Sequence, residues 1–132
     1  MPILSIHHVQ LAMPANQEDL ARAFYVHILG LTEIPKPAEL ANRGGAWFQY
    51  PDPTAVELLS EPVVQVHLGV ETDFRAARKA HPALIVDDLD SLLEKIQIAG
   101  YEWDLSQPPL EGFKRAHVFD PFGNRIELME KL

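Results

Sequence analysis

The chain has 132 residues, 47% of them hydrophobic and 23% charged, a composition typical of one folded domain with a substantial core. Its net charge of −8 argues against nucleic acid or an anionic membrane as a partner. The absence of cysteine excludes disulfides and thiolate ligands, so a bound metal would need nitrogen and oxygen donors. The opening residues lack a signal-peptide pattern and no apolar run approaches about 20 residues, so we expect a cytoplasmic protein.

The first half of the chain predicts a strand, a helix and three further strands. Alternating apolar and β-branched residues predict the first strand over 3–12. Asn16 is expected to cap a helix that ends at Gly30. The apolar face of this helix is expected to carry Leu20, Ala23, Phe24, His27 and Ile28. Further strands are expected at 32–34, 46–50 and 63–70, and 52–62 is ambiguous because 55–59 can also be read as a short strand.

The second half repeats this order. A strand over 83–86 precedes a helix that Asp87 or Asp88 can cap and Gly100 ends, with Leu89, Leu92, Leu93, Ile96 and Ala99 on its apolar face. Strands are expected near 101–103, 115–119 and 125–129, the last two joined by a Pro- and Gly-containing turn. His8 and His81 lie 73 residues apart and Gly30 and Gly100 lie 70 apart, which favours two βαβββ modules, about 1–72 and 80–132.

Polar residues collect on one face of several predicted strands, because side chains alternate along a strand. The opposite faces are apolar, and histidine is unusually frequent on the polar ones. His8 and His81 open the two modules, and with Glu127 they form a ligand set suited to a divalent metal with open positions. The other polar-face candidates are Gln10, His67, Arg115 and His117.

Four motifs occur in order along nearly the whole chain. They are His8-Val9-Gln10-Leu11-Ala12, Ala23-Phe24-Tyr25 with Leu29-Gly30-Leu31, His81-Pro82-Ala83-Leu84-Ile85-Val86, and Asp120-Pro121-Phe122-Gly123-Asn124-Arg125-Ile126-Glu127. This ordered set resembles the vicinal oxygen chelate superfamily, which includes glyoxalase I, fosfomycin-resistance transferases, extradiol dioxygenases and bleomycin-resistance proteins.

The resemblance implies an α+β fold with a single glyoxalase-like domain over 1–132. Its two βαβββ modules would form an open U-shaped mixed sheet, with helices on the outer face and a metal in the concavity. Family ligands come from the first and last strands of each module, which implies His8, His81 and Glu127. At the fourth position His67 stands where bacterial glyoxalase I has a glutamate. Glu57 would replace it if 55–59 is the fourth strand, and a three-residue site is equally consistent.

The resemblance also implies roles for other residues. Gln10 and His117 resemble substrate-contacting positions, and Arg115 is expected either to hold an anionic group or to pair with a surface acid. Glu127 is the candidate catalytic base. A homodimer is implied in which sites are shared between subunits, so that His8 of one chain joins His81 and Glu127 of the other.

The implied function is that of a divalent-metal-dependent lyase, isomerase or transferase of the glyoxalase type. Its small substrate would chelate Zn, Ni, Mn, Co or Fe through adjacent oxygens. The first alternative is a metal-free ligand-binding protein of the bleomycin-resistance kind, to which the acidic net charge adds an affinity for cationic ligands. The second alternative is an Fe(II) ring-cleaving dioxygenase.

Overall fold

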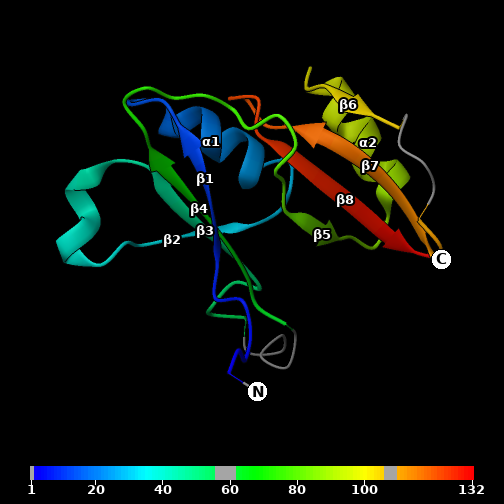
Figure 1. Ribbon diagram of the computed structural model, residues 1–132, viewed down its shortest axis with the longest axis horizontal. Helices are drawn as coiled ribbons and strands as arrows, with labels where there is room; N and C mark the ends of the chain where they lie inside the picture. Colours follow the sequence, from blue (N-terminus) through cyan, green and yellow to red (C-terminus); the bar gives the residue numbers. More distant parts are fainter. Residues whose placement is uncertain (1, 56–61, 106–109) are drawn as a thin grey trace. The chain divides into compact units, whose positions relative to one another are not determined.

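The computed structural model describes residues 2–55, 62–105 and 110–132, and the chain divides into two compact units, Met1–Phe74 and Arg75–Leu132 (Figure 1). Each unit contains an α-helix and a four-stranded mixed sheet. The strand orders are β1-β4-β3-β2 and β5-β8-β7-β6, so in both sheets the last strand of the unit lies beside the first. The predicted pair of βαβββ modules is therefore confirmed. Neither described helix is long and apolar enough to cross a lipid bilayer.

Unit 1 is built around β4, which pairs in parallel with β1 and antiparallel with β3. Phe24 and Tyr25 from the helix are fully buried, and the Tyr25 ring stacks on Phe48 with centroids 5.4 Å apart. The elements are β1 (Val9–Met13), α1 (Glu18–Tyr25), β2 (Thr32–Ile34), the 3-10 helix η1 (Ala38–Arg43), β3 (Ala46–Tyr50) and β4 (Val64–Val70).

Unit 2 has the same arrangement around β8, which pairs in parallel with β5 and antiparallel with β7. Asp88 caps the helix, as predicted, because its side chain accepts a hydrogen bond from the Ser91 amide at 3.1 Å. Glu130 accepts a second amide, that of Leu89, at 2.6 Å. The elements are β5 (Ala83–Ile85), α2 (Leu89–Ile98), β6 (Trp103–Asp104), β7 (Phe113–Phe119) and β8 (Arg125–Lys131).

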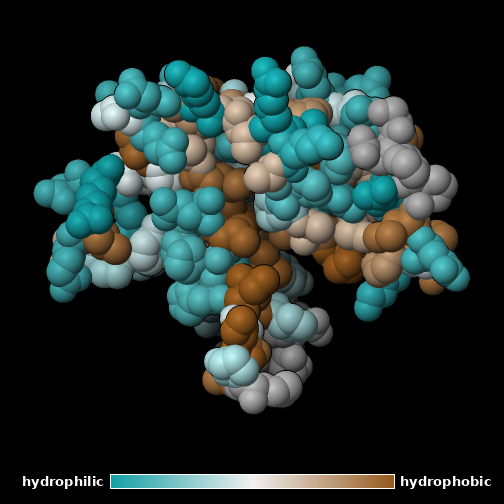
Figure 2. Space-filling view, in the orientation of Figure 1, coloured by the Kyte–Doolittle hydropathy of each residue, from teal (hydrophilic) through white to brown (hydrophobic). Residues whose placement is uncertain are grey.

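The first strand is shorter than predicted, because β1 starts at Val9 and not at residue 3. Its pairing with β4 begins with Val9 opposite Val66, although β4 itself already starts at Val64. The segment before β1 leaves Ile3, Leu4 and Ile6 exposed at 82%, 90% and 79%. Figure 2 shows hydrophobic side chains along this N-terminal segment.

The predicted apolar face of the first helix was right for Phe24 but wrong for Leu20 and His27. Leu20 is 48% exposed and His27, which lies beyond the end of α1, is exposed, whereas Ala21, Phe24 and Tyr25 are buried. The two adjacent aromatic rings decide the orientation, because they bury more apolar surface than Leu20 would. Asn16 has a positive φ of 64° and is not the cap; the cap position is Gln17, which makes no side-chain capping bond.

Candidate metal centre

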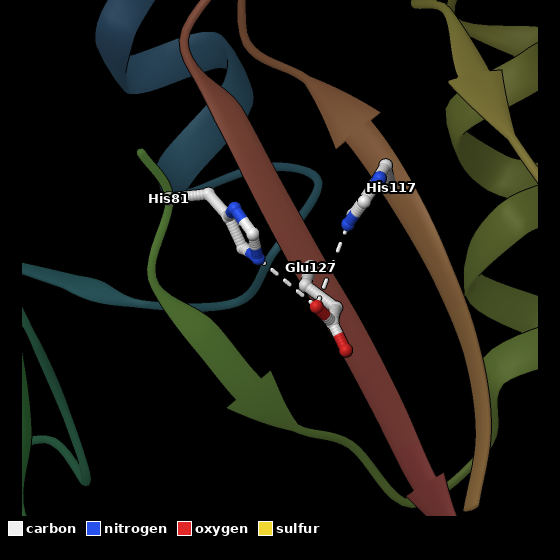
Figure 3. Close-up of side chains that lie close together, drawn as sticks. All are labelled: His81, His117 and Glu127. Carbon is white, nitrogen blue, oxygen red and sulfur yellow. Dashed lines mark hydrogen bonds and ion pairs between the residues drawn. The ribbon is translucent and has the colours of Figure 1, made fainter. Parts of the chain in front are cut away.

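Three potential metal ligands of unit 2 lie together on one face of its sheet (Figure 3). Glu127 belongs to the central strand β8 and is the register partner of His117 on β7. On the other side Glu127 pairs with Ala83 of β5, and His81 lies two residues before Ala83. Ligand atoms from the three side chains all lie within 4.8 Å of one another. Residues 46 positions apart in sequence are thus brought together by strand pairing.

Both imidazoles point at the same carboxylate oxygen. His81 Nε2 lies 3.0 Å and His117 Nε2 lies 3.4 Å from Glu127 Oε1. The second distance exceeds the usual range for a hydrogen bond, and the buried His117 Nε2 makes no well-formed one. A buried nitrogen without a hydrogen-bond partner costs free energy, which a bound cation would recover.

A second contact fixes the proton position on His81. Its Nδ1 lies 2.6 Å from the backbone carbonyl oxygen of Lys79, which can only accept a hydrogen bond. Nδ1 therefore carries the hydrogen, and in the neutral ring Nε2 presents a lone pair to Glu127. Two lone pairs at 3.0 Å require a proton or a metal ion between them. Metal-ligating histidines commonly donate their other N–H to a backbone carbonyl in this way.

Arg115 holds the other oxygen of the same carboxylate. Its Nη1 donates to Glu127 Oε2 at 3.2 Å, which leaves Oε1 for the histidines. Burial raises the pKa of Glu127, but the contacts with His81, Arg115 and His117 outweigh it and lower the pKa below its usual value. Glu127 is therefore ionised at neutral pH, as a metal ligand must be.

His117 is buried and remains neutral. Burial lowers its pKa, the contact with Glu127 opposes this effect, and electrostatic repulsion from the neighbouring His81 and Arg125 side chains adds to the lowering. Its ring lies edge-on to His81, with centroids 4.9 Å apart. A neutral buried imidazole beside an ionised carboxylate provides the nitrogen and oxygen donors that a divalent transition metal prefers.

Unit 1 carries an equivalent set of positions with different side chains. His8 lies two residues before Gln10, which pairs with His67 of the central strand β4, and Trp47 of β3 pairs with His67 from the other side. By register, His8, His67 and Trp47 therefore correspond to His81, Glu127 and His117 of unit 2. Their rings form a stack: His67 lies 3.9 Å from Trp47 and 4.0 Å from His8, centroid to centroid.

Gln10, the register partner of His67 on β1, extends its side chain toward Gly69 of β4. An ideal Cβ built on Gly69 would come within 2.6 Å of Gln10 Nε2, so the missing side chain at 69 makes room for the Gln10 amide.

Burial lowers the pKa of His67 to about 4, and the charges of His8 and His7 add to the effect. Glu57, the alternative fourth ligand, lies outside the described residues.

The sequence missed His117 as a candidate metal ligand, although alternation placed it on the polar face. The missing signal was the register of β7 against β8, which sets His117 opposite Glu127 and not Arg115 or Phe119. A shift of two residues preserves every inward and outward assignment, so alternation alone does not choose between these pairs.

Comparisons with known proteins agree with this architecture. A family model described as the Glyoxalase/Bleomycin resistance protein/Dioxygenase superfamily matches residues 5–128. A glyoxalase family protein from Bacillus anthracis is 41% identical, with a TM-score of 0.80 over 98% of this chain and 97% of that one. A search of the curated proteins found no significant match.

Two more distant structures share the fold. One is a variant of FosX, the genomically encoded fosfomycin resistance protein of Listeria monocytogenes, in complex with Mn(II) and a dihydroxypropylphosphonic acid. It is 17% identical, with a TM-score of 0.69 over 98% of this chain and 94% of that one. The other is TnmS3, an antibiotic binding protein from a Streptomyces species, 22% identical with a TM-score of 0.62 over 98% and 100%.

Proposed function

Because the chain belongs to the Glyoxalase/Bleomycin resistance protein/Dioxygenase superfamily, we propose that it is a divalent-metal-dependent lyase, isomerase or transferase of the glyoxalase type. The observation that carries the proposal is the convergence of His81 Nε2 and His117 Nε2 on Glu127 Oε1. The FosX variant of the same fold holds Mn(II), which is consistent with a metal in this chain.

His81, His117 and Glu127 would hold the cation, His117 being added to the predicted set. The cation supplies Lewis acidity toward a small substrate that presents adjacent oxygens. The Arg115 guanidinium neutralises Glu127 Oε2 and orients the carboxylate. Glu127 as catalytic base would first have to lose contacts, because those with His81 and Arg115 lower its pKa and weaken it as a proton acceptor.

His8 and His67 are the proposed contributors from unit 1, and Gln10 and Arg115 the proposed substrate contacts. We propose a homodimer in which His8 of one chain completes the site of His81 and Glu127 in the other. The exposed apolar segment that carries Ile3, Leu4 and Ile6 supports association, because such a surface is costly to leave in water.

Metal content and affinity test the proposal directly. Elemental analysis of the purified protein, followed by calorimetric titration of the chelated protein with Zn²⁺ or Mn²⁺, should give one ion per chain. His81→Ala and His117→Ala should each weaken binding by more than about 100-fold, because each removes a ligand. His27→Ala, which changes an exposed histidine outside the cluster, is the matched control. Unchanged affinity in both cluster variants would refute the metal site.

Sharing between subunits has its own test. His8→Ala and His81→Ala proteins, each deficient in metal binding, are unfolded together, refolded as a mixture and titrated with Zn²⁺. Half of the chains should then be in mixed dimers, each with one intact site, so about one site per four chains should regain wild-type affinity. No recovery would show that His8 and His81 act within one chain or at separate places.

The second function, metal-free binding of a cationic ligand, is favoured by the net charge of −8. If the purified protein lacks metal and does not take up Zn²⁺, Mn²⁺, Ni²⁺, Co²⁺ or Fe²⁺, metal-free ligand binding would be favoured over the metal-dependent enzyme. Iron at one ion per chain with oxygen consumption on catechols would instead favour the ring-cleaving dioxygenase.

A further inference from the structure

Unit 1 contains a chain of three side-chain hydrogen bonds that ends on a backbone carbonyl. His67 Nε2 lies 2.9 Å from Gln65 Oε1, and Gln65 Nε2 lies 3.1 Å from Gln49 Oε1. Gln49 Nε2 lies 3.0 Å from the carbonyl oxygen of Pro51. Gln49 and Gln65 are register partners, and His67 follows two residues later on β4, so the three side chains share one face of the sheet.

The donor and acceptor of each hydrogen bond in this chain follow from the Pro51 carbonyl oxygen at its end. The Pro51 carbonyl only accepts, so the Gln49 atom that faces it must be the amide nitrogen. The Gln49 oxygen then faces Gln65 and must receive the Gln65 nitrogen. This leaves the Gln65 oxygen toward His67, so His67 Nε2 must donate. The neutral ring therefore carries its hydrogen on Nε2 and leaves Nδ1 as a lone pair.

The surroundings of His67 preserve this orientation. Trp47 and His8 stack on its ring at interplanar angles of 5° and 13°. A half-turn of the ring would keep both stacks but would set a carbon against Gln65 Oε1, so the hydrogen bond selects one orientation. Within residues 2–55, 62–105 and 110–132, His67 Nδ1 has no hydrogen-bond partner.

We propose that Gln49 and Gln65 are positioning residues that fix His67 as the Nε2–H tautomer, so that Nδ1 is the atom His67 offers to a ligand. The chemistry required of the ligand is an electron-pair acceptor, supplied either by a hydroxyl hydrogen of the substrate or by a divalent cation. This inference deepens the proposed function, since it names the atom by which unit 1 would contact substrate or metal.

The test is a two-bond ¹H–¹⁵N spectrum of the full chain with ¹⁵N-labelled histidine, recorded without metal at pH 8, where imidazole is neutral. His67→Gln identifies the resonances by their loss. Wild-type protein should show the shift of a protonated nitrogen at Nε2 and of a bare nitrogen at Nδ1. A protonated Nδ1 would overturn the proposal. Because metal is absent, failure of the metal site leaves this result unaffected.

Variants separate positioning from general packing. Gln65→Leu should move the tautomer ratio toward Nδ1–H by about two- to tenfold, the value of one neutral hydrogen bond. Gln65→Glu keeps an accepting oxygen and should retain the Nε2–H form. Thr32→Val, opposite Gln49 on the same face of the sheet but outside the hydrogen-bond chain, is the matched control and should leave the tautomer ratio unchanged. An unchanged ratio in Gln65→Leu would show that Gln65 does not set the tautomer.

Addition of Zn²⁺ distinguishes the two sources of the electron-pair acceptor. A shift of His67 Nδ1 that saturates with one equivalent, together with weaker binding in His67→Gln, identifies a cation at Nδ1. A response confined to the nitrogens of His8, His81 and His117 leaves Nδ1 for a substrate hydroxyl. Coordination of zinc through His67 Nε2 would overturn the proposal, because that nitrogen would have to give up its hydrogen to the metal.

Discussion

Glu127 is a buried carboxylate that contacts two imidazoles and a guanidinium: those of His81, His117 and Arg115. A buried charge is tolerated only when it is paired in this way. Removal of one partner leaves an uncompensated buried charge, which destabilises the folded state. The carboxylate of Glu127 is therefore expected to stabilise the fold as well as to serve as the proposed metal ligand.

Replacement of Glu127 by Gln should separate these two contributions. The amide preserves the shape but removes the charge that faces His81 and Arg115, so the free energy of unfolding should fall by about 1–3 kcal/mol in urea denaturation. Zn²⁺ affinity should fall by more than about 100-fold in calorimetry. Glu94→Gln on the exposed side of α2 is the control and should leave both values unchanged. Zinc binding at wild-type strength would remove Glu127 from the ligand set.

His67 makes the stability depend on pH. Burial lowers its pKa to about 4 in the folded chain, against about 6.5 in an unfolded one. The neutral form is thus favoured by folding, and its contribution is complete above pH 6.5 and is lost as the pH falls toward 4. The loss is roughly 3 kcal/mol at most.

Urea midpoints between pH 7 and pH 4.5 should therefore fall less steeply in His67→Gln than in wild type. His117, whose pKa is also lowered by burial, contributes in the same direction in both proteins, so the difference between them isolates His67. His27→Gln should follow the wild-type curve. Parallel slopes in His67→Gln and wild type would contradict the low pKa.

On the scale of secondary-structure elements, the approach of β3 to β4 depends on a glycine. Gly45, directly before β3, has a φ of +82°, and a Cβ there would lie 2.0 Å from the Leu68 carbonyl oxygen. The Gly45 amide also donates to Glu18 Oε2 at 2.9 Å, which ties the start of β3 to α1. Gly30 has a similar φ of +79° but nothing within 4 Å of its Cβ position.

This pair of glycines gives a matched comparison. Gly30→Ala carries only the backbone penalty of the left-handed region and should destabilise by about 1 kcal/mol. Gly45→Ala adds a clash with backbone that cannot move without separating β3 from β4, so its loss should exceed that of Gly30→Ala by about 2 kcal/mol or more. Equal unfolding free energies for the two variants would show that the β3–β4 contact yields easily.

Sequence patterns predicted the ranges of strands well where alternation and flanking turn residues mark both ends. The strands at 32–34 and 46–50 match β2 and β3, because their alternation is bounded by turn residues. The first strand was predicted to start at residue 3 but starts at Val9, because alternation marks which residues suit a strand and does not set where pairing with β4 begins. For the site, residue types predicted His81 and Glu127 as candidates, but only the register shows that His117 faces Glu127.

For the whole molecule, the two units repeat one topology but carry different side chains at equivalent positions. Unit 2 has the carboxylate and two imidazoles, whereas unit 1 has a stack of His8, His67 and Trp47. A metal bound only by residues of unit 2 would stabilise that unit alone. If His8 is also a ligand, as proposed, metal binding would stabilise β1 as well.

Hydrogen exchange measured with and without Zn²⁺ tests this difference. Amides of β7 and β8 should exchange more slowly with zinc, because binding to the folded state raises its stability. Amides at the start of β1 should also gain protection, since His8 lies directly before Val9. His8→Ala should abolish the gain in β1 and, as the control, retain part of the gain in β7 and β8. Protection that never includes β1 in the wild type would exclude His8 as a ligand.

The place of β8 in its sheet also bears on how the chain matures during synthesis. Strand β8 leaves the ribosome after β5 and β7, yet in the finished sheet it lies between them. A nascent chain that has emerged as far as β7 holds both imidazoles of the centre but neither the carboxylate nor the strand that brings them together. Metal binding in unit 2 would therefore follow the insertion of β8 between β5 and β7. A nascent chain stalled before β8 would lack a complete metal site.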